Sequence, residues 1–299
     1  MSAIKASIRK AARFYLTHTP IIKGRYPLMM AVQRLAGEQV TVETEVKDRG
    51  RMILDLADSA QFPLYYNIYE WKDLPTIQAL LEGCNVVLDI GGNIGQMALL
   101  FARHAKKVLT FEPIPALAER LRKQVELNGL QKKVLIYPVA LTNFNGMLPL
   151  QLPTVENGGN GSTVLGRDGA GETIEVQAQT LDSLLEQEQI NGVDLIKIDV
   201  EGAELFVLQG MEKLLSQENR PIIILEMNSG MMKLAGYSAS AITSLLAGHG
   251  YECFEFVKNG LEGSIQNPEP GIENYCFLTQ SHKSRPSVQR ALQRKLSYS

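Results

Sequence analysis

The stretch that most constrains this chain is Val86–Gly95, in which a short apolar run reaches a carboxylate and then turns through glycines. The run Val86–Ile90 is rich in β-branched residues and nearly continuous in its hydrophobicity, which is typical of a parallel strand covered on both faces. Three glycines then allow a tight turn, and a helical pattern follows over Gln96–Arg103. A strand that ends in such a turn brings backbone N–H groups toward a ligand at the carboxyl edge of a parallel sheet.

Strands and helices alternate regularly after this stretch. The further strands expected are Val108–Phe111, Val134–Val139, Asp194–Asp199, Pro221–Leu225, Tyr251–Val257 and Tyr275–Thr279, with helices at Ala116–Asn128, Ala203–Leu215 and Ala239–Ala247. This alternation predicts an α/β fold with a doubly wound, mostly parallel, seven-stranded sheet. The last two strands have no helix between them, so we expect an antiparallel strand at one edge. Met147–Leu152 and Thr173–Leu181 are expected to form an inserted hairpin, joined by a glycine-rich segment at 157–163.

The first 72 residues follow a different pattern and are expected to form an extension of helices and a β-hairpin. Ile4–Leu16 has apolar residues at helical spacing among cations, which predicts a basic amphipathic helix, and Pro27–Leu35 predicts a second, short one. Val40–Val46 and Arg51–Leu56 have the alternation of a hairpin. We therefore divide the chain into an extension (residues 1–72), a main domain (residues 73–282) and a basic tail (residues 283–299).

Both ends of the chain are basic, because residues 1–37 and residues 274–299 contain no Asp or Glu. Three interpretations of the N-terminal helix stay open: it docks on an anionic membrane surface, it contacts an acidic partner, or it packs on the domain or in a homo-oligomer. The net charge of −2 argues against a general nucleic-acid binder. Three cysteines without metal spacing, the lack of a long apolar run and the lack of a signal pattern favour a cytoplasmic protein, with peripheral membrane contact as an alternative.

The spacing of the glycines indicates the kind of ligand. A dinucleotide site has G-x-G-x-x-G after the strand, whereas this chain has D-x-G-x-N-x-G, formed by Asp89, Gly91, Asn93 and Gly95. A carboxylate within the turn repels phosphate but pairs with an amine or a sulfonium. Glu112 ends the next strand, where an acid accepts ribose hydroxyls, and the helix after the turn can receive a carboxylate at its N-terminus. These features predict S-adenosylmethionine as the cofactor and disfavour a nucleotide-cofactor dehydrogenase.

Several blocks of the sequence resemble the FkbM-type S-adenosylmethionine-dependent methyltransferases, a branch of the class I methyltransferases. The blocks are Val87–Gly95, Phe111–Pro113, Leu127–Gly129, Val139–Leu141 and, most specific to the family, Val193–Glu204. The resemblance covers residues 73–228 and implies a Rossmann-like class I fold and O-methylation of a sugar, glycan or related metabolite. The implied cofactor-binding residues are Asp89, Gly91, Gly92, Asn93, Gly95, Glu112 and Ala140. Thr142-Asn143 replaces the acid that commonly follows the Ala-Leu pair, so the adenine side departs from the family pattern.

Methyl transfer to a hydroxyl requires alignment of the reacting atoms and removal of one proton. Asp199 ends a middle strand and Glu226 ends the next, while Lys197 shares a face with Asp199 because side chains alternate along a strand. We expect Asp199 or Glu201 to act as the general base or to orient the acceptor, with Lys197 and Glu226 completing the catalytic set. The alternative is that Glu201 only caps the following helix and that Lys197 only holds the sheet together.

A divalent metal is possible at this edge but is not favoured. Asp199, Glu226 and Asn228 offer oxygen ligands of the kind that Mg²⁺ accepts. They are weak candidates, because the methyl donor is already activated and a simple base suffices. A competing hypothesis for the whole chain is a membrane-surface or nucleic-acid-associated binding protein with a secondary or vestigial methyltransferase fold, which would explain the two basic ends.

Overall fold

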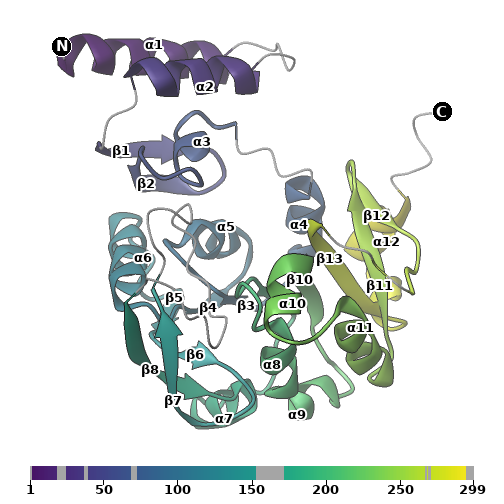
Figure 1. Ribbon diagram of the computed structural model, residues 1–299. Helices are drawn as coiled ribbons and strands as arrows, with labels where there is room; N and C mark the ends of the chain where they lie inside the picture. The colour runs from purple at the N-terminus through teal and green to yellow at the C-terminus, as the bar shows by residue number, and fades with distance from the viewer. Residues whose placement is uncertain are drawn as a thin grey trace. The chain divides into compact units, whose positions relative to one another are not determined.

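A computed structural model of the chain describes residues 2–18, 25–36, 40–68, 73–152, 172–266, 268 and 271–293 (Figure 1). The chain divides into two units, which we call the N-terminal unit (residues 1–71) and the main unit (residues 72–154 and 160–299). The glycine-rich joint predicted at 157–163 and the end of the basic tail, residues 294–299, lie outside the described residues.

The N-terminal unit contains the two helices and the hairpin that the sequence predicts. Its elements are α1 (Ser2–His18), α2 (Arg25–Ala36), β1 (Thr41–Val46), β2 (Gly50–Asp55) and α3 (Phe62–Tyr65). The helices α1 and α2 lie side by side (Figure 1). The strands β1 and β2 pair in antiparallel register from Thr41 opposite Asp55 to Val46 opposite Gly50. Asp48 and Gly50 adopt positive φ angles, which close the turn between the strands.

The main unit is built on one large sheet. Its strands, in spatial order, are β12 (Gly260–Glu262), β11 (Tyr251–Val257), β13 (Ile272–Thr279), β10 (Ile222–Asn228), β9 (Leu195–Ile198), β3 (Val86–Ile90), β4 (Lys107–Phe111) and β5 (Val134–Tyr137). The strands from β10 to β5 run parallel to one another, while β13 runs antiparallel to β10 and β11. The strand order reverses between β3 and β9, and the carboxyl ends of the strands at such a point are where sheets of this kind bind ligands.

The apolar runs become the central strands because both of their faces are covered. All four residues of β9 are buried, and so are the last four of β3 and of β4. The side chains on one of these faces, among them Leu88, Leu109 and Ile196, belong to a core that also takes in Phe277 of β13 and helical residues beside the sheet. This rigid centre holds the strand ends that carry the predicted site.

The predicted α/β, doubly wound, mostly parallel fold is confirmed, with two differences of detail. The sheet has eight strands within the described residues rather than seven, because the short strand β12 adds to β11 at the edge. The helix predicted over Ala203–Leu215 is broken into α8 (Glu204–Gln209) and α9 (Glu212–Leu215). The break occurs at Gly210, where a Cβ would lie 2.0 Å from the carbonyl oxygen of Thr142, so this close approach of two backbone segments requires glycine.

The inserted hairpin is confirmed as part of a second, small sheet. It consists of β7 (Gly146–Gln151) and β8 (Thr173–Gln179), which pair antiparallel, and β6 (Ala140–Leu141), which pairs with β8 in parallel. A separate apolar cluster that includes Leu150 and Val176 lies beneath it.

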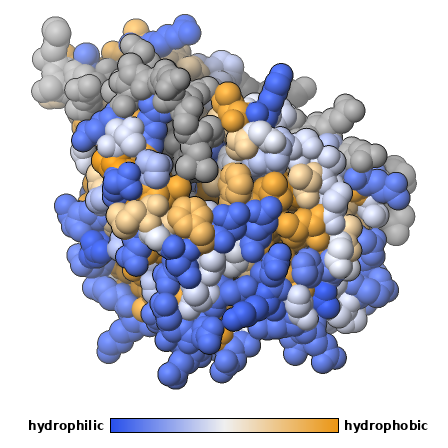
Figure 2. Space-filling view, turned by 60° about the horizontal axis from the view of Figure 1, so that its bottom comes forward, coloured by the Kyte–Doolittle hydropathy of each residue, from blue (hydrophilic) through white to orange (hydrophobic). Residues whose placement is uncertain are grey.

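Helices complete the main unit. They are α4 (Leu74–Leu80), α5 (Gln96–His104), α6 (Pro115–Leu127), α7 (Leu181–Gln187), α10 (Ser229–Leu234), α11 (Ala239–Gly248), the 3₁₀ helix η2 (His282–Ser284) and α12 (Pro286–Gln293). The face shown in Figure 2 is largely hydrophilic, with a band of hydrophobic side chains across its middle. In the described part of the chain, no helix combines the length and apolar character needed to cross a membrane.

Candidate active site

The glycine turn after β3 is held by backbone contacts that leave no room for side chains. Gly91 has a φ of +92°, and a Cβ there would lie 1.8 Å from the carbonyl oxygen of Asp199. The N–H groups of Gly91 and Gly92 both donate to the carbonyl oxygen of Phe111, at 3.0 and 2.8 Å. Gly95, also at positive φ, begins α5 without a side-chain cap. The first N–H groups of α5 therefore lack acceptors within the helix and can receive an anionic group.

Asp89 is fully buried at the end of β3. Its Oδ2 accepts a hydrogen bond from the hydroxyl of Thr110 at 3.3 Å. Burial raises the pKa of Asp89 to about 7; the ammonium of Lys197 opposes the shift and the carboxylate of Asp199 adds to it. A cation brought beside Asp89 would stabilise its ionised form.

Glu112 lies at the end of β4 and closes the glycine turn from the side. One carboxylate oxygen accepts the N–H of Asn93 at 2.8 Å, and the other accepts the N–H of Ile114 at 2.9 Å. Burial raises the pKa of Glu112 to about 7, although both N–H groups favour the ionised form. A carboxylate accepts up to about four hydrogen bonds, so lone pairs remain for the ribose hydroxyls that the sequence predicts as its partners.

A row of polar side chains crosses the buried centre of the sheet. Asp89 pairs in register with Thr110 on β4 and with Lys197 on β9, and residues in register on parallel strands point to the same face. Lys197 is 1% exposed, and its Nζ donates to Oδ2 of Asp199 at 2.7 Å. Burial opposes the charge of Lys197, but the carboxylates of Asp199, Glu226 and Asp89 outweigh it and raise the pKa of the ammonium group. Lys197 is therefore a buried cation shared by acids on three neighbouring strands.

Three carboxylates converge at the carboxyl edge of β9 and β10. Ligand oxygens of Asp199, Glu201 and Glu226 all lie within 4.8 Å of one another, and we call these residues the acidic trio. Burial and the nearby carboxylate of Asp199 raise the pKa of Glu201 and that of Glu226 to about 7. A carboxylate with a pKa near 7 accepts a proton most effectively at neutral pH. The trio also has the oxygen ligands that could hold a divalent metal.

The turn that carries Glu201 is fastened by residues that sequence reasoning missed. Glu201 has a φ of +51°, a conformation that is uncommon outside glycine and often found at functional sites. Glu204 is buried and accepts the N–H of Gly202 at 2.9 Å and the hydroxyl of Tyr237 at 2.7 Å. The same hydroxyl lies 3.2 Å from the carbonyl oxygen of Gly202. In the sequence, Glu204 stood out only as the last residue of the family block Val193–Glu204. Tyr237 lies between α10 and α11, where no local sequence pattern indicates a role.

Two predicted site residues have structural partners of their own. Asn228 caps α10, because its Oδ1 accepts the N–H groups of Gly230 and Met231. Ala140 lies in β6, buried in the cluster beneath the small sheet. The possible metal ligands that lie close together are therefore the carboxylates of the acidic trio. Asp199 and Glu226 belong to the predicted set, and Glu201 takes the place of the predicted Asn228.

Comparison of the sequence with known families identifies the domain. Residues 89–253, more than half of the chain, match the model of the methyltransferase FkbM domain. The chain belongs to the FkbM methyltransferase family. The expected resemblance is therefore confirmed, and the main unit contains an S-adenosylmethionine-dependent methyltransferase domain of this family.

The curated proteins that this chain matches are distant in sequence. Methyltransferase sdnD of Sordaria araneosa is 29% identical over 157 residues, which cover 42% of this chain and 60% of the relative. Hexuronic acid methyltransferase AglP of Haloferax volcanii is 28% identical over 160 residues, covering 52% of this chain and 62% of the relative. The chain spans between 9% and 62% of the length of the curated relatives it matches. The crystal structure of methyltransferase FkbM from Methylobacillus flagellatus KT has a TM-score of 0.41 and 13% identity, covering 73% of this chain and 54% of that one.

The donor set at the glycine turn fits the cofactor of the FkbM family. Asp89 offers a buried carboxylate to a cationic group, the uncapped start of α5 offers N–H groups to a carboxylate, and Glu112 offers oxygens to hydroxyls. In addition, the buried Oε1 of Gln96, the first residue of α5, accepts no hydrogen bond within the described part of the chain. A bound polar group near this turn would satisfy it, and sequence reasoning did not single out Gln96.

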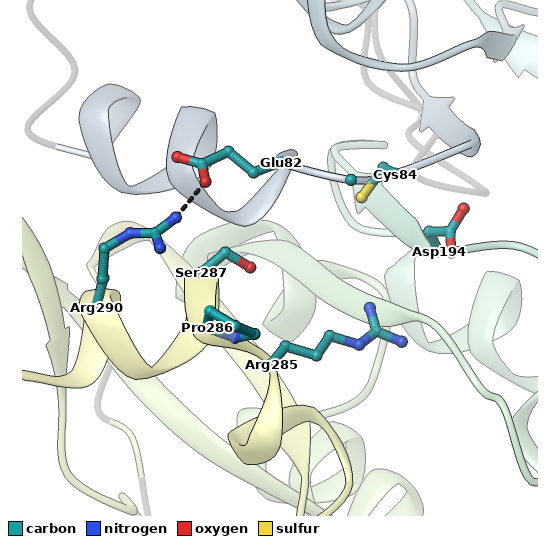
Figure 3. Close-up of a pocket in the computed structure, with 8 residues that line it drawn as sticks. Glu82, Cys84, Asp194, Arg285, Pro286, Ser287 and Arg290 are labelled. Carbon is teal, nitrogen blue, oxygen red and sulfur yellow. Dashed lines mark hydrogen bonds and ion pairs between the residues drawn. The ribbon is translucent and has the colours of Figure 1, made fainter.

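A separate cavity of about 500 Å³ lies at the opposite, amino edge of the sheet (Figure 3). Arg290 of α12 forms an ion pair with Glu82 across it, and Asp194 accepts the N–H groups of Asn85 and Val86 at 2.7 and 2.9 Å. None of the predicted cofactor or catalytic residues lines this cavity. It therefore contributes nothing to the site at the carboxyl edge.

Proposed function

We propose that this chain is an O-methyltransferase that methylates a hydroxyl of a sugar, a glycan or a related metabolite. The observation that carries the proposal is the acidic trio beside the glycine turn, an arrangement that would place a proton acceptor next to the cofactor. The contact between the two is direct, because the N–H of Asp199 donates to the carbonyl oxygen of Ile90 at 2.9 Å, immediately before the turn.

The cofactor site would use the residues around the turn. Asp89 would pair with the positive charge of S-adenosylmethionine, Glu112 would accept its ribose hydroxyls, and α5 would receive its carboxylate. Gly91, Gly92, Asn93 and Gly95 would shape the backbone around it, with Ala140 on the adenine side. When bound, S-adenosylmethionine supplies an activated methyl group. The protein then has to place the acceptor in line and remove one proton.

The acidic trio would provide the base. Lys197 holds Asp199 through its 2.7 Å ion pair, so Asp199 is suited to orient the acceptor hydroxyl. Glu201 lies beside it with a pKa of about 7 and is suited to take the proton, while Glu226 completes the wall. Lys197 would act as a positioning residue, because its ammonium group is buried and donates to Asp199.

The class of acceptor rests on a relative. AglP is named as a hexuronic acid methyltransferase, and its similarity to this chain supports a sugar acid as the first acceptor to test. We assign the activity to residues 73–282. Because Val288 and Ala291 of α12 are buried in the main unit, a shortened protein for assays should extend to residue 293.

A metal is not needed for this chemistry. The acidic trio could hold Mg²⁺, which would polarise a hydroxyl. A carboxylate base with a pKa of about 7 already accounts for proton removal from an acceptor aligned with an activated donor.

The experiment that tests the proposal measures binding first and transfer second. Calorimetry with S-adenosylmethionine should show binding to the wild type and none to Asp89→Ala. Radiolabelled methyl transfer should then be screened against hexuronic acids, neutral sugars and glycans, and the product mapped by mass spectrometry. Absence of cofactor binding to the wild type would overturn the proposal, whereas binding with transfer only to nitrogen or carbon acceptors would overturn the O-methylation part alone.

A further inference from the structure

The apolar stripe of α1 faces solvent. Ile4, Ile8 and Tyr15 lie on one side of this helix, at i, i+4 and i+11, and are 67%, 40% and 45% exposed. The buried side chains of α1 are instead Arg9 and Leu16, which lie on a different side. An amphipathic helix normally turns its apolar stripe to a core. Here the protein leaves that stripe uncovered.

The neighbouring helix α2 repeats the pattern. Leu28 and Leu35, seven residues apart, are exposed, while Met29 and Val32 are buried. Eleven large hydrophobic side chains are exposed in the described part of the chain, and seven of them belong to these two helices: Ile4, Ile8, Phe14, Tyr15, Tyr26, Leu28 and Leu35. Hydrophobic residues concentrated in this way mark an interaction surface rather than the usual scatter.

The charge around the two helices defines the sign of the partner. Residues 1–37 contain seven Lys and Arg and no Asp or Glu. Lys10 on α1 and Arg34 on α2 are exposed. A second copy of this chain would bring the same cations against them, and like charges across an interface are unfavourable. An anionic surface with an apolar interior complements both the cations and the stripe.

We propose that α1 and α2 dock this chain on an anionic membrane surface. Each helix would lie in the plane of the interface, with its apolar stripe at the boundary between headgroups and acyl chains and its cations among anionic headgroups. Tyr15, which belongs to the stripe of α1, has the apolar body and polar tip that suit this depth. The docking would be peripheral and independent of the methyltransferase site.

Vesicle sedimentation of the full chain tests this proposal. We expect binding to vesicles of phosphatidylcholine mixed with phosphatidylserine and little binding to phosphatidylcholine alone. The double substitution Ile4→Ser and Ile8→Ser should weaken binding by about tenfold or more, because two apolar side chains no longer insert. Lys10→Glu should weaken it by about fivefold or more, since each cation near such a surface contributes roughly that factor.

Two matched controls test whether the effect is specific to α1 and α2 or follows from any change of net charge or exposed hydrophobicity. Lys132→Glu makes the same change of net charge at an exposed site in the main unit, and Met147→Ser removes an exposed apolar side chain there. Both should bind vesicles as the wild type does, and circular dichroism should show that all variants are folded. Equal binding to neutral and anionic vesicles, or equal loss in the controls, would overturn the proposal. Self-association without vesicles that the isoleucine variant abolishes would also overturn it and assign the stripe to a second copy.

Discussion

The most direct test of the site's architecture is the substitution Gly91→Ala. Gly91 follows β3 and packs against the end of β9, where a Cβ would lie 1.8 Å from the carbonyl oxygen and 2.8 Å from the carbonyl carbon of Asp199. Both atoms are backbone, so no side chain can rotate away to relieve the contact. The φ of +92° is a second cost for any residue with a Cβ.

The expected loss of stability has two parts. A left-handed backbone conformation costs an alanine about 1–2 kcal/mol, and forcing a methyl group into a filled space costs about 1–3 kcal/mol, so the total should be about 2–5 kcal/mol. Gly129 provides a matched control, because its φ is +66° but nothing lies within 4 Å of its ideal Cβ. Gly129→Ala should therefore cost only the backbone part, about 1–2 kcal/mol.

Urea denaturation followed by circular dichroism measures both losses. The difference between the two variants isolates the contact with Asp199, and Gly91→Ala should also impair methyl transfer because the carbonyl that moves belongs to a residue of the acidic trio. If both variants lose the same stability, the close approach of β3 and β9 at this point is wrong, whatever happens to activity.

Four further predictions concern the site and its surroundings. The pKa of Asp89 is raised to about 7 from a usual 3.8, so its contribution to stability is fully present below about pH 4 and is lost as the pH rises to about 7. Asp89→Asn should therefore gain stability relative to the wild type between about pH 4 and pH 7 in urea titrations, and an unchanged difference would contradict this. Tyr237→Phe removes a 2.7 Å hydrogen bond to Glu204, which we call the Glu204–Tyr237 clamp, and should lower both stability and kcat. Tyr251→Phe is the control, because it removes a 2.7 Å hydrogen bond to the carbonyl of Pro221 elsewhere and should lower stability alone. Equal kcat values in the two variants would argue against a role for the clamp. Glu201→Gln should lower kcat by about 10²–10⁴-fold while S-adenosylmethionine still binds in calorimetry. The activity of the wild type should survive exhaustive chelation. Loss of activity that Mg²⁺ restores would instead show a metal-dependent reaction.

Sequence reasoning predicted the structure around the glycine turn correctly, because the pattern there lies within short stretches of the chain. The structure has a strand at the apolar run before Asp89 and a turn at the glycines after it. Glu112 comes directly after the next strand, as its position in the sequence predicts. Each of these features depends on residues within one strand and one turn. The structure places Glu112 directly against the turn through the N–H of Asn93.

Sequence reasoning failed at three features, and one of them joins segments far apart in the chain. The sequence offered Asn228 as a weak candidate metal ligand at a strand end, but its side chain caps α10 because the nearest unsatisfied N–H groups belong to that helix. The clamp between Glu204 and Tyr237 joins α8 to the segment before α11, and no periodicity connects those two positions. The edge strand β12 is only three residues long, too short for an alternating pattern to reveal it.

The sequence by itself determined the family, the doubly wound sheet and the identity of the turn, because strand hydrophobicity, glycine spacing and motif residues are local properties. Only the tertiary structure decided which acids meet. Placing β9 between β3 and β10 brings Lys197 into register with Asp89 and sets Glu226 beside Asp199 and Glu201. The same holds for α1, whose periodicity shows that one side is apolar but whose packing leaves that side exposed. Strand order and helix docking are set by the sum of long-range contacts, which no single segment encodes.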